Sequence, residues 1–143
     1  FRVKMLERSP VVAALLRDGL LRGLAQAQGE LYDALSRLSL SQTDAIEHLS
    51  SIDEQPDIIY MDPMFPLSKK SALVKKEMRA FHHVVGEDDT GEVLLSLARQ
   101  AVRYRVVVKR PKKSDYLAGQ KPSVSLEGKA IRFDVYTVKA LPK

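Results

Sequence analysis

The spacing of apolar residues along the chain switches repeatedly between the period of a strand and that of a helix. Apolar residues alternate, or form short β-branched runs, in six segments that we predict as strands: residues 2–6, 38–43, 57–62, 104–108, 123–127 and 130–138. Apolar residues spaced by three and four predict helices between them, over about residues 9–28, 31–37, 45–49, 71–85 and 90–101. This order favours an α/β fold in which a mainly parallel sheet ends in an antiparallel hairpin.

Short polar motifs mark the ends of the predicted helices. Ser9 is a good N-cap and Pro10 suits the first helical position, so a helix is expected to begin there and to close near Gly29. Residues 89–92, Asp-Thr-Gly-Glu, have the form of a capping box for the last helix. The predicted apolar stripe of that helix consists of Leu94, Leu97, Ala98 and Ala101.

Residues 57–66 combine a short strand with an acid, a proline and an aromatic residue. The β-branched run Ile58–Met61 suits a strand that is buried on both faces. Pro63 prevents its continuation, so Asp62 and Phe65 are expected in a stiff loop at the strand's carboxyl end, where open α/β sheets bind ligands. There the carboxylate could accept a hydrogen bond from the exocyclic amine of a base while the ring stacks on it. The alternative is that Asp62 caps the next helix and Phe65 is a core residue.

Four charged residues each follow a different predicted strand: Glu7, Asp44, Asp62 and Lys109. The carboxyl ends of parallel strands meet at one edge of a sheet, so these side chains are expected to converge there. An acid in the position of Glu7 typically binds ribose hydroxyls in nucleotide-binding α/β units, although Glu7 could instead pair with Arg8 or face solvent.

Charge is distributed unevenly over the 143 residues. Residues 1–55 carry 6 basic and 8 acidic side chains, whereas residues 56–143 carry 17 and 10. A basic half suggests a polyanionic partner, although a solvated lysine-rich surface explains it as well. Basic side chains gather beside the Asp62 loop and on one face of the helix predicted after it: Lys69, Lys70, Lys75, Lys76, Arg79 and His82.

Several classes of protein do not fit the composition. With 45% hydrophobic residues, a folded domain is expected. The absence of cysteine excludes a disulfide framework and thiolate zinc sites, and it suits a reducing compartment such as the cytoplasm. The adjacent His82 and His83 lack the spacing of metal ligands, so no metal site is expected. No apolar run approaches the roughly 20 residues that span a bilayer, so no membrane association is expected.

The loop after the 57–62 strand resembles the Asn/Asp-Pro-Pro-Tyr/Phe catalytic loop of class I S-adenosylmethionine-dependent methyltransferases that modify exocyclic amines, with Met64 in place of the second proline. Four longer blocks are similar to the RsmJ family of bacterial small-subunit ribosomal RNA guanine-N2 methyltransferases: residues 5–16, 62–66, 70–79 and 106–111. The resemblance implies a Rossmann-like class I methyltransferase fold and methyl transfer to the N2 amine of a guanine in 16S ribosomal RNA.

The same resemblance implies roles for individual residues. The implied cofactor is S-adenosylmethionine, bound by Glu7, Arg8, Asp44 and Asp62. The implied catalytic residues are Asp62, Pro63 and Phe65, where Asp62 accepts from the guanine amine and Phe65 stacks on the base. The implied partner is ribosomal RNA or the small ribosomal subunit, contacted by Met64, Lys69, Lys70, Lys75, Lys76, Arg79, Lys109 and Arg110.

One departure from the family concerns the cofactor site. The family's Gly-rich loop follows the first strand of the family fold. Residues 1–143 contain no such loop, which would lie before Phe1. We therefore expect residues 1–143 to be the C-terminal portion of a single methyltransferase domain, with weak or no cofactor binding by themselves. Three alternatives stay open: an adenine-N6 or cytosine-N4 DNA methyltransferase, another nucleotide-binding α/β domain, and a non-catalytic RNA-binding module. The sequence does not predict the oligomeric state.

Overall fold

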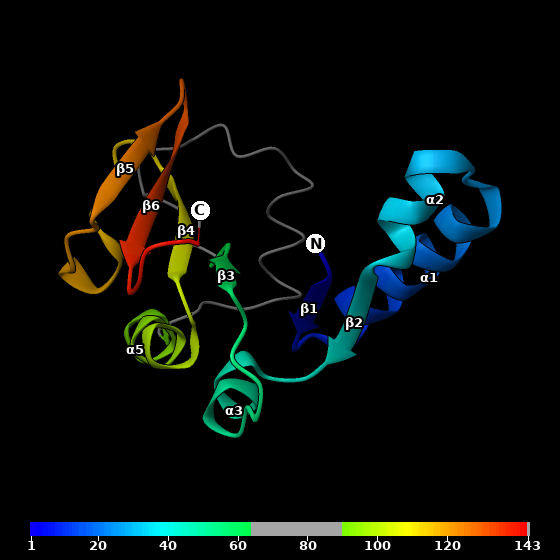
Figure 1. Cartoon of the computed structure of the whole chain (residues 1–143), viewed down its shortest axis with the longest axis horizontal. Coiled ribbons are helices and arrows are strands. Elements are labelled where there is room, and N and C mark those ends of the chain that lie inside the picture. The colour runs from blue at the N-terminus through cyan, green and yellow to red at the C-terminus, as the bar shows by residue number, and fades with distance from the viewer. Residues whose placement is uncertain (64–89, 143) are drawn as a thin grey trace. The chain divides into compact units, whose positions relative to one another are not determined.

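The computed structural model describes residues 1–63 and 90–142 of the chain. Contacts between residues divide it into two compact units, Phe1–His48 and Leu49–Lys143. Each unit contains its own sheet of strands (Figure 1). We describe the two units separately.

Unit 1 is built on a pair of parallel strands. Strand β1 (Val3–Glu7) pairs with β2 (Leu38–Gln42), and the register places Glu7 beside Gln42. Helices α1 (Pro10–Gln26) and α2 (Gly29–Ser36) connect the two strands, and α3 (Ala45–Ser50) follows β2. This strand–helix–strand order with parallel pairing confirms the alternation predicted from the sequence.

The start of α1 follows the predicted capping chemistry. The Ser9 hydroxyl accepts a hydrogen bond from the Val12 amide at 3.4 Å, and Pro10 occupies the first turn. Val12 and Ala13 are the buried residues of this helix. Gly29 adopts φ +55°, a left-handed conformation that glycine tolerates well, and it begins α2 instead of closing α1 as predicted.

Unit 2 contains a mixed sheet with the strand order β3-β4-β6-β5. Strands β3 (Ile58–Met61) and β4 (Arg105–Pro111) are parallel, whereas β6 (Ile131–Thr137) is antiparallel to both β4 and β5 (Val124–Glu127). The predicted C-terminal hairpin is therefore confirmed. Helix α5 (Gly91–Ala101) precedes β4, and the short helix η1 (Leu117–Gly119) lies between β4 and β5.

The core of unit 2 lies between one face of this sheet and α5. Its buried members come from β3, β4, β6, α5, η1 and the residue after α5: Met61, Leu95, Ala98, Val102, Val106, Val108, Leu117 and Tyr136. Leu95, not the predicted Leu97, is fully buried in α5. Thr90 is the N-cap of α5, and its side chain makes no capping hydrogen bond. The predicted capping box begins at Asp89, which lies outside the described residues, so it stays a prediction.

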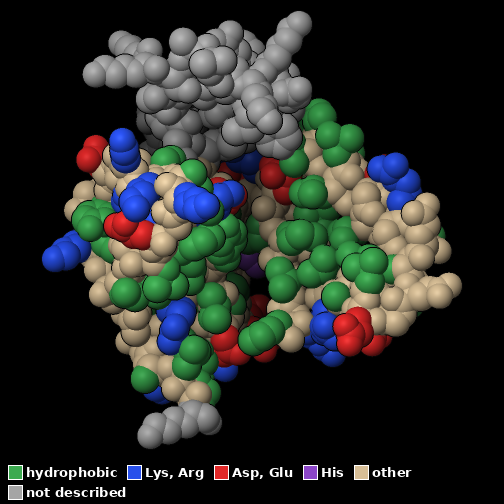
Figure 2. All heavy atoms as spheres, turned by 90° about the horizontal axis from the view of Figure 1, so that it is seen from above, with side chains coloured by type: hydrophobic (Ala, Val, Ile, Leu, Met, Phe, Trp, Pro, Cys, Tyr) green, Lys and Arg blue, Asp and Glu red, His purple; other side chains and the backbone are tan. Residues whose placement is uncertain are grey.

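The opposite face of β3 departs from the prediction. Side chains alternate along a strand, so Ile59 and Met61 face the core whereas Ile58 and Tyr60 face away. Ile58 and Tyr60 are 42% and 55% exposed, so burial of β3 on both faces is not observed among the described residues. Figure 2 shows hydrophobic side chains at the surface beside charged ones.

Strand β4 is longer than predicted. The sequence pattern ended the strand at Val108, but the backbone stays extended to Pro111. The reason is pairing with β6, in which Lys109 faces Phe133, Arg110 faces Arg132 and Pro111 faces Ile131. No helix among the described residues is long and apolar enough to cross a membrane.

Candidate active site

Asp62 lies directly after β3, at the carboxyl end of the parallel pair β3–β4. The register aligns Met61 with Val108, so the next residues, Asp62 and Lys109, stand beside each other. The Lys109 ammonium group donates a hydrogen bond to Asp62 Oδ2 at 2.8 Å. The lysine side chain is 36% exposed and the aspartate side chain 50% exposed. The structure therefore places an accessible carboxylate, with an ammonium partner, at the predicted position.

Two neighbouring groups have shifted pKa values. The hydrogen bond to Asp62 and the charge of that carboxylate raise the pKa of Lys109 above its ordinary value, and desolvation opposes them only in part. Partial desolvation of its hydroxyl, and secondarily the Asp62 charge, raises the pKa of Tyr60, while the Lys109 charge opposes this rise. Both Lys109 and Tyr60 are therefore protonated at neutral pH, as a cation and a neutral phenol.

Tyr60 lies near Asp62 and Lys109, and the sequence pattern did not single it out. Its ring centroid lies 6.5 Å from that of Phe133 on β6, with the two rings tilted by 45°. Tyr60 and Asp62 are two residues apart, so a strand period carries both toward the same face. That spacing is the signal in the sequence that points to Tyr60, whereas the apolar pattern predicts it only as part of a buried strand.

A second pair of acids lies at the carboxyl ends of the strands of unit 1. Glu7 ends β1, and its Oε1 accepts a hydrogen bond from the Ser9 amide at 2.7 Å. Asp44 follows β2, and its Oδ1 accepts from the Ile46 amide at 2.7 Å and from the Glu47 amide at 3.4 Å. Asp44 thus caps α3. In each of the two acids, one carboxylate oxygen is held by hydrogen bonds from backbone amides.

The structure joins the four predicted edge residues in two pairs. Asp62 and Lys109 are in direct contact within unit 2. Glu7 and Asp44 follow neighbouring strands within unit 1, where the Thr43 amide donates to the Glu7 carbonyl at 3.0 Å. Convergence of all four on a single edge stays a prediction, because the pairs belong to different units.

The remaining predicted site residues differ in exposure, and several of them lie outside the described residues. Pro63 is half-buried, and Arg8 is exposed. Arg110 is only 8% exposed, and its guanidinium group donates to the Asp115 carbonyl, which argues against the predicted RNA contact. The other predicted catalytic and RNA-contacting residues lie outside the described residues: Met64, Phe65, Lys69, Lys70, Lys75, Lys76 and Arg79.

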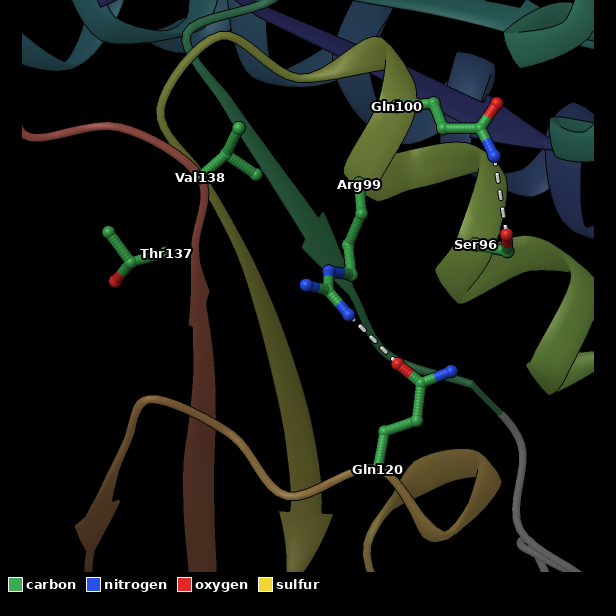
Figure 3. Close-up of a pocket in the computed structure, with 6 residues that line it drawn as sticks. All are labelled: Ser96, Arg99, Gln100, Gln120, Thr137 and Val138. Carbon is green, nitrogen blue, oxygen red and sulfur yellow. Dashed lines mark hydrogen bonds between the residues drawn. The ribbon is translucent and has the colours of Figure 1, made fainter.

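A pocket of about 460 Å³ lies elsewhere on unit 2 (Figure 3). Ser96, Arg99 and Gln100 of α5 line it together with Gln120, Thr137 and Val138. Thr137 pairs with Arg105, the first residue of β4, whereas Lys109 lies near the other end of that strand. The pocket is therefore not part of the Asp62 site. Among residues 1–63 and 90–142, no cluster of three or more acidic or histidine side chains could hold a metal ion.

Comparison with known proteins relates the chain to methyltransferases. A family model described as "Putative SAM-dependent methyltransferase" matches residues 1–138. The chain is 53% identical to a protein of Cellvibrio japonicus and 51% identical to one of Coxiella burnetii, over 99% and 96% of its length. Both relatives carry the name "Ribosomal RNA small subunit methyltransferase J". The aligned regions cover 55% and 52% of them, so the chain spans about half the length of these curated relatives.

A solved structure supports the fold assignment. The crystal structure of a SAM-dependent methyltransferase from Neisseria gonorrhoeae is 40% identical and superposes with a TM-score of 0.75. The match covers 96% of this chain and 52% of that one. The predicted α/β, Rossmann-like class I methyltransferase fold is thus confirmed, as is the resemblance on which it rested.

Proposed function

The chain belongs to this family of SAM-dependent methyltransferases, and from that premise we propose that the protein transfers a methyl group from S-adenosylmethionine to the exocyclic N2 amine of a guanine in 16S ribosomal RNA. The observation that carries the proposal is the hydrogen bonding of the two carboxylate oxygens of Asp62. Its Oδ2 is held by Lys109, whereas its Oδ1 has no hydrogen-bond partner among the described residues. A half-exposed carboxylate oxygen at the carboxyl end of a parallel strand can accept a hydrogen bond from an amine that enters from solvent.

The chemistry explains why an acceptor is useful there. The lone pair of a guanine N2 amine is delocalised into the ring, so the amine is a weak nucleophile. Asp62 Oδ1 would accept a hydrogen bond from one N–H and fix the direction in which the nitrogen lone pair points. Such positioning can lower the activation barrier of the reaction by a large part when the reacting atoms are held in line. The base would have to leave any stacked or paired state to reach Asp62.

The cofactor supplies, when bound, an electrophilic methyl group on a sulfonium sulfur. Glu7 and Asp44 suit the nucleoside part of such a molecule, because each has a second carboxylate oxygen without a partner among the described residues. Carboxylate oxygens accept from ribose hydroxyls and from an adenine amine. We assign the ribose to Glu7, the neighbourhood of the adenine to Asp44, and a supporting contact to Arg8.

The RNA side of the proposal rests on the names of the relatives and on the family resemblance. The relatives act, by name, on small-subunit ribosomal RNA. We propose that Phe65 stacks on the target base, that Pro63 keeps the loop stiff, and that Met64 and the basic residues between 69 and 79 contact RNA. A reaction on ribosomal RNA would take place in the cytoplasm. The proposed partner is the small ribosomal subunit or its RNA.

The proposal is tested by a tritium transfer assay with S-adenosylmethionine and the protein at the length of its curated relatives. The substrates would be small ribosomal subunits lacking the modification, naked ribosomal RNA, and DNA. We expect label on ribosomal RNA and a loss of about 100-fold in Asp62→Ala, because an unpositioned amine reacts that much more slowly.

A matched control is available at the other end of β3. Asp57, before the other end of β3, forms an exposed ion pair with Arg103, also at 2.8 Å. Asp57→Ala should therefore leave methyl transfer nearly unchanged. Label on DNA alone, or equal losses in the two variants, would contradict the proposal.

A further inference from the structure

The backbone of Lys109 is fixed by a strand on each side. Its backbone lies in β4, between β3 on one side and β6 on the other, and it pairs in register with Phe133. The neighbouring Val108 and Arg110 are buried, so strand alternation turns Lys109 toward the sheet face opposite the core. From this fixed position its ammonium group reaches Asp62 Oδ2 at 2.8 Å.

Electrostatics disfavours a direct contact between Lys109 and an RNA phosphate. A phosphate that bound Lys109 at hydrogen-bond distance would come close to the Asp62 carboxylate, and like charges repel. If Lys109 left Asp62 for the phosphate, an unneutralised carboxylate would face an anionic substrate. With Lys109 bound to Asp62, the pair is neutral overall and the substrate can approach.

We propose that Lys109 is a positioning residue: it holds Asp62 by a hydrogen bond to Oδ2 and so leaves Oδ1 directed at the target amine. This role replaces the RNA contact that the family resemblance implies for Lys109. This inference rests on the proposed methyl transfer and deepens it. Lys109 would not touch the substrate. It would fix the rotamer of Asp62 and cancel its charge, because a carboxylate with one oxygen anchored has little freedom left to turn the other.

Kinetics separates this role from a phosphate contact. Lys109→Met should lower kcat about 10-fold to 100-fold, as expected when an acceptor is displaced by a fraction of an ångström to 1 Å. The KM and Kd for RNA, and the dependence of Kd on salt, should stay unchanged. Lys109→Arg should restore part of kcat, since it keeps a cation beside Asp62. Unchanged kcat with a raised KM for RNA and a weaker salt dependence would overturn the inference.

Lys112 provides a matched control. It lies three residues further along the chain, and its ammonium group forms an exposed ion pair with Glu127 at 2.9 Å. Lys112→Met also removes one positive charge and breaks an ion pair of similar exposure. This ion pair does not involve Asp62, so the substitution should leave kcat unchanged. An equal fall of kcat in Lys109→Met and Lys112→Met would overturn the inference, because loss of any nearby pair would then have the same effect.

A double variant tests whether Lys109 acts through Asp62. Asp62→Asn leaves no carboxylate to grip, so adding Lys109→Met to it should lower kcat no further. If the two losses multiply, Lys109 acts independently of Asp62 and the inference is wrong.

The pairing itself can be measured without any activity. A carbon-13 NMR titration of the Lys109 side chain should give a higher pKa in the wild type than in Asp62→Asn. Equal pKa values would overturn the pairing, and with it the inference. If the wild type labels no RNA, the proposed function fails, while this titration still decides whether Lys109 grips Asp62.

Discussion

Arg132 and Asp134 form an ion pair inside unit 2, with side chains that are 7% and 0% exposed. Arg132 Nε donates to both Asp134 oxygens, at 2.9 and 3.1 Å. One guanidinium nitrogen of Arg132 also donates to the carbonyls of Lys112 and Ser114, at 2.7 and 2.8 Å. Arg132 thus ties the segment after β4 to β6. The hydrogen bond to Asp134 raises the pKa of Arg132, so the guanidinium group keeps its charge.

Arg132→Ala should destabilise unit 2 by about 3–5 kcal/mol, because it leaves a buried carboxylate without its charge partner. Urea denaturation followed by circular dichroism measures the change. Arg103→Ala is the control, since Arg103 pairs with Asp57 at the surface and such pairs contribute about 1 kcal/mol or less. Similar losses in the two variants would show that burial does not decide the strength of these pairs.

The sequence was informative about the position of individual site residues and less so about their partners. The position of Asp62 followed from a strand stopped by proline, and the structure places it there with an accessible carboxylate. The partnership of Lys109 with Asp62 did not follow, because it depends on the register between two strands 47 positions apart in the chain. The burial of Arg110 did not follow from the sequence either, since strand alternation turns it inward only once β4 continues past Val108.

At the level of elements, the contact between α5 and η1 depends on the absence of a side chain at Gly91. A Cβ atom at this position would come within 2.8 Å of Leu117 Cδ1, and Leu117 is 8% exposed. The close approach brings η1 onto the first turn of α5 and closes the core of unit 2 at that end.

Gly91→Ala should cost about 1–3 kcal/mol, because Leu117 must shift within a packed core. Gly19→Ala is the opposite case. Gly19 lies within α1, and an added Cβ meets nothing within 4 Å, so the substitution should stabilise the helix by about 0.8–1 kcal/mol. Denaturant midpoints of the two variants should move in opposite directions. A stabilised Gly91→Ala would contradict the packing described for η1.

Elements with strong local signals were predicted well, and elements shaped by tertiary pairing were not. Ser9-Pro10 marked the start of α1 correctly, since capping is a local interaction. The end of β4 was placed at Val108 although the strand runs to Pro111, because only pairing with β6 keeps Lys109–Pro111 extended. The buried stripe of α5 was shifted by the same kind of error, since the sheet and η1 select Leu95 over Leu97.

At the scale of the whole molecule, three groups among the described residues make stability sensitive to alkaline pH. The pKa values of Tyr60 and Tyr136 are raised above 10.0, mainly by burial, and that of Lys109 is raised above 10.5 by its hydrogen bond to Asp62. A raised pKa means that the folded state holds the proton more tightly than the unfolded state. The stability from these groups is therefore fully present below about pH 10 and is lost as the pH rises through the raised values.

Urea denaturation at pH 8, 9, 10 and 11 should show a constant free energy of unfolding up to pH 9 and a fall above pH 10. Tyr136 is 3% exposed and its hydroxyl donates to the Gln120 carbonyl at 2.9 Å. Tyr136→Phe should lower stability at pH 8 by about 1 kcal/mol through loss of this hydrogen bond, and should weaken the alkaline fall. Stability that rises above pH 10 would contradict the sign of the shifts.

The central claim is that Asp62 directs methyl transfer to the N2 amine of a guanine in small-subunit ribosomal RNA. The most direct test is to digest RNA from small subunits treated with the protein and labelled S-adenosylmethionine, and to identify the labelled nucleoside by mass spectrometry. The account predicts a single product, N2-methylguanosine, which falls about 100-fold with Asp62→Ala. Label in a different nucleoside, or N2-methylguanosine formed equally well by Asp62→Ala, would contradict it.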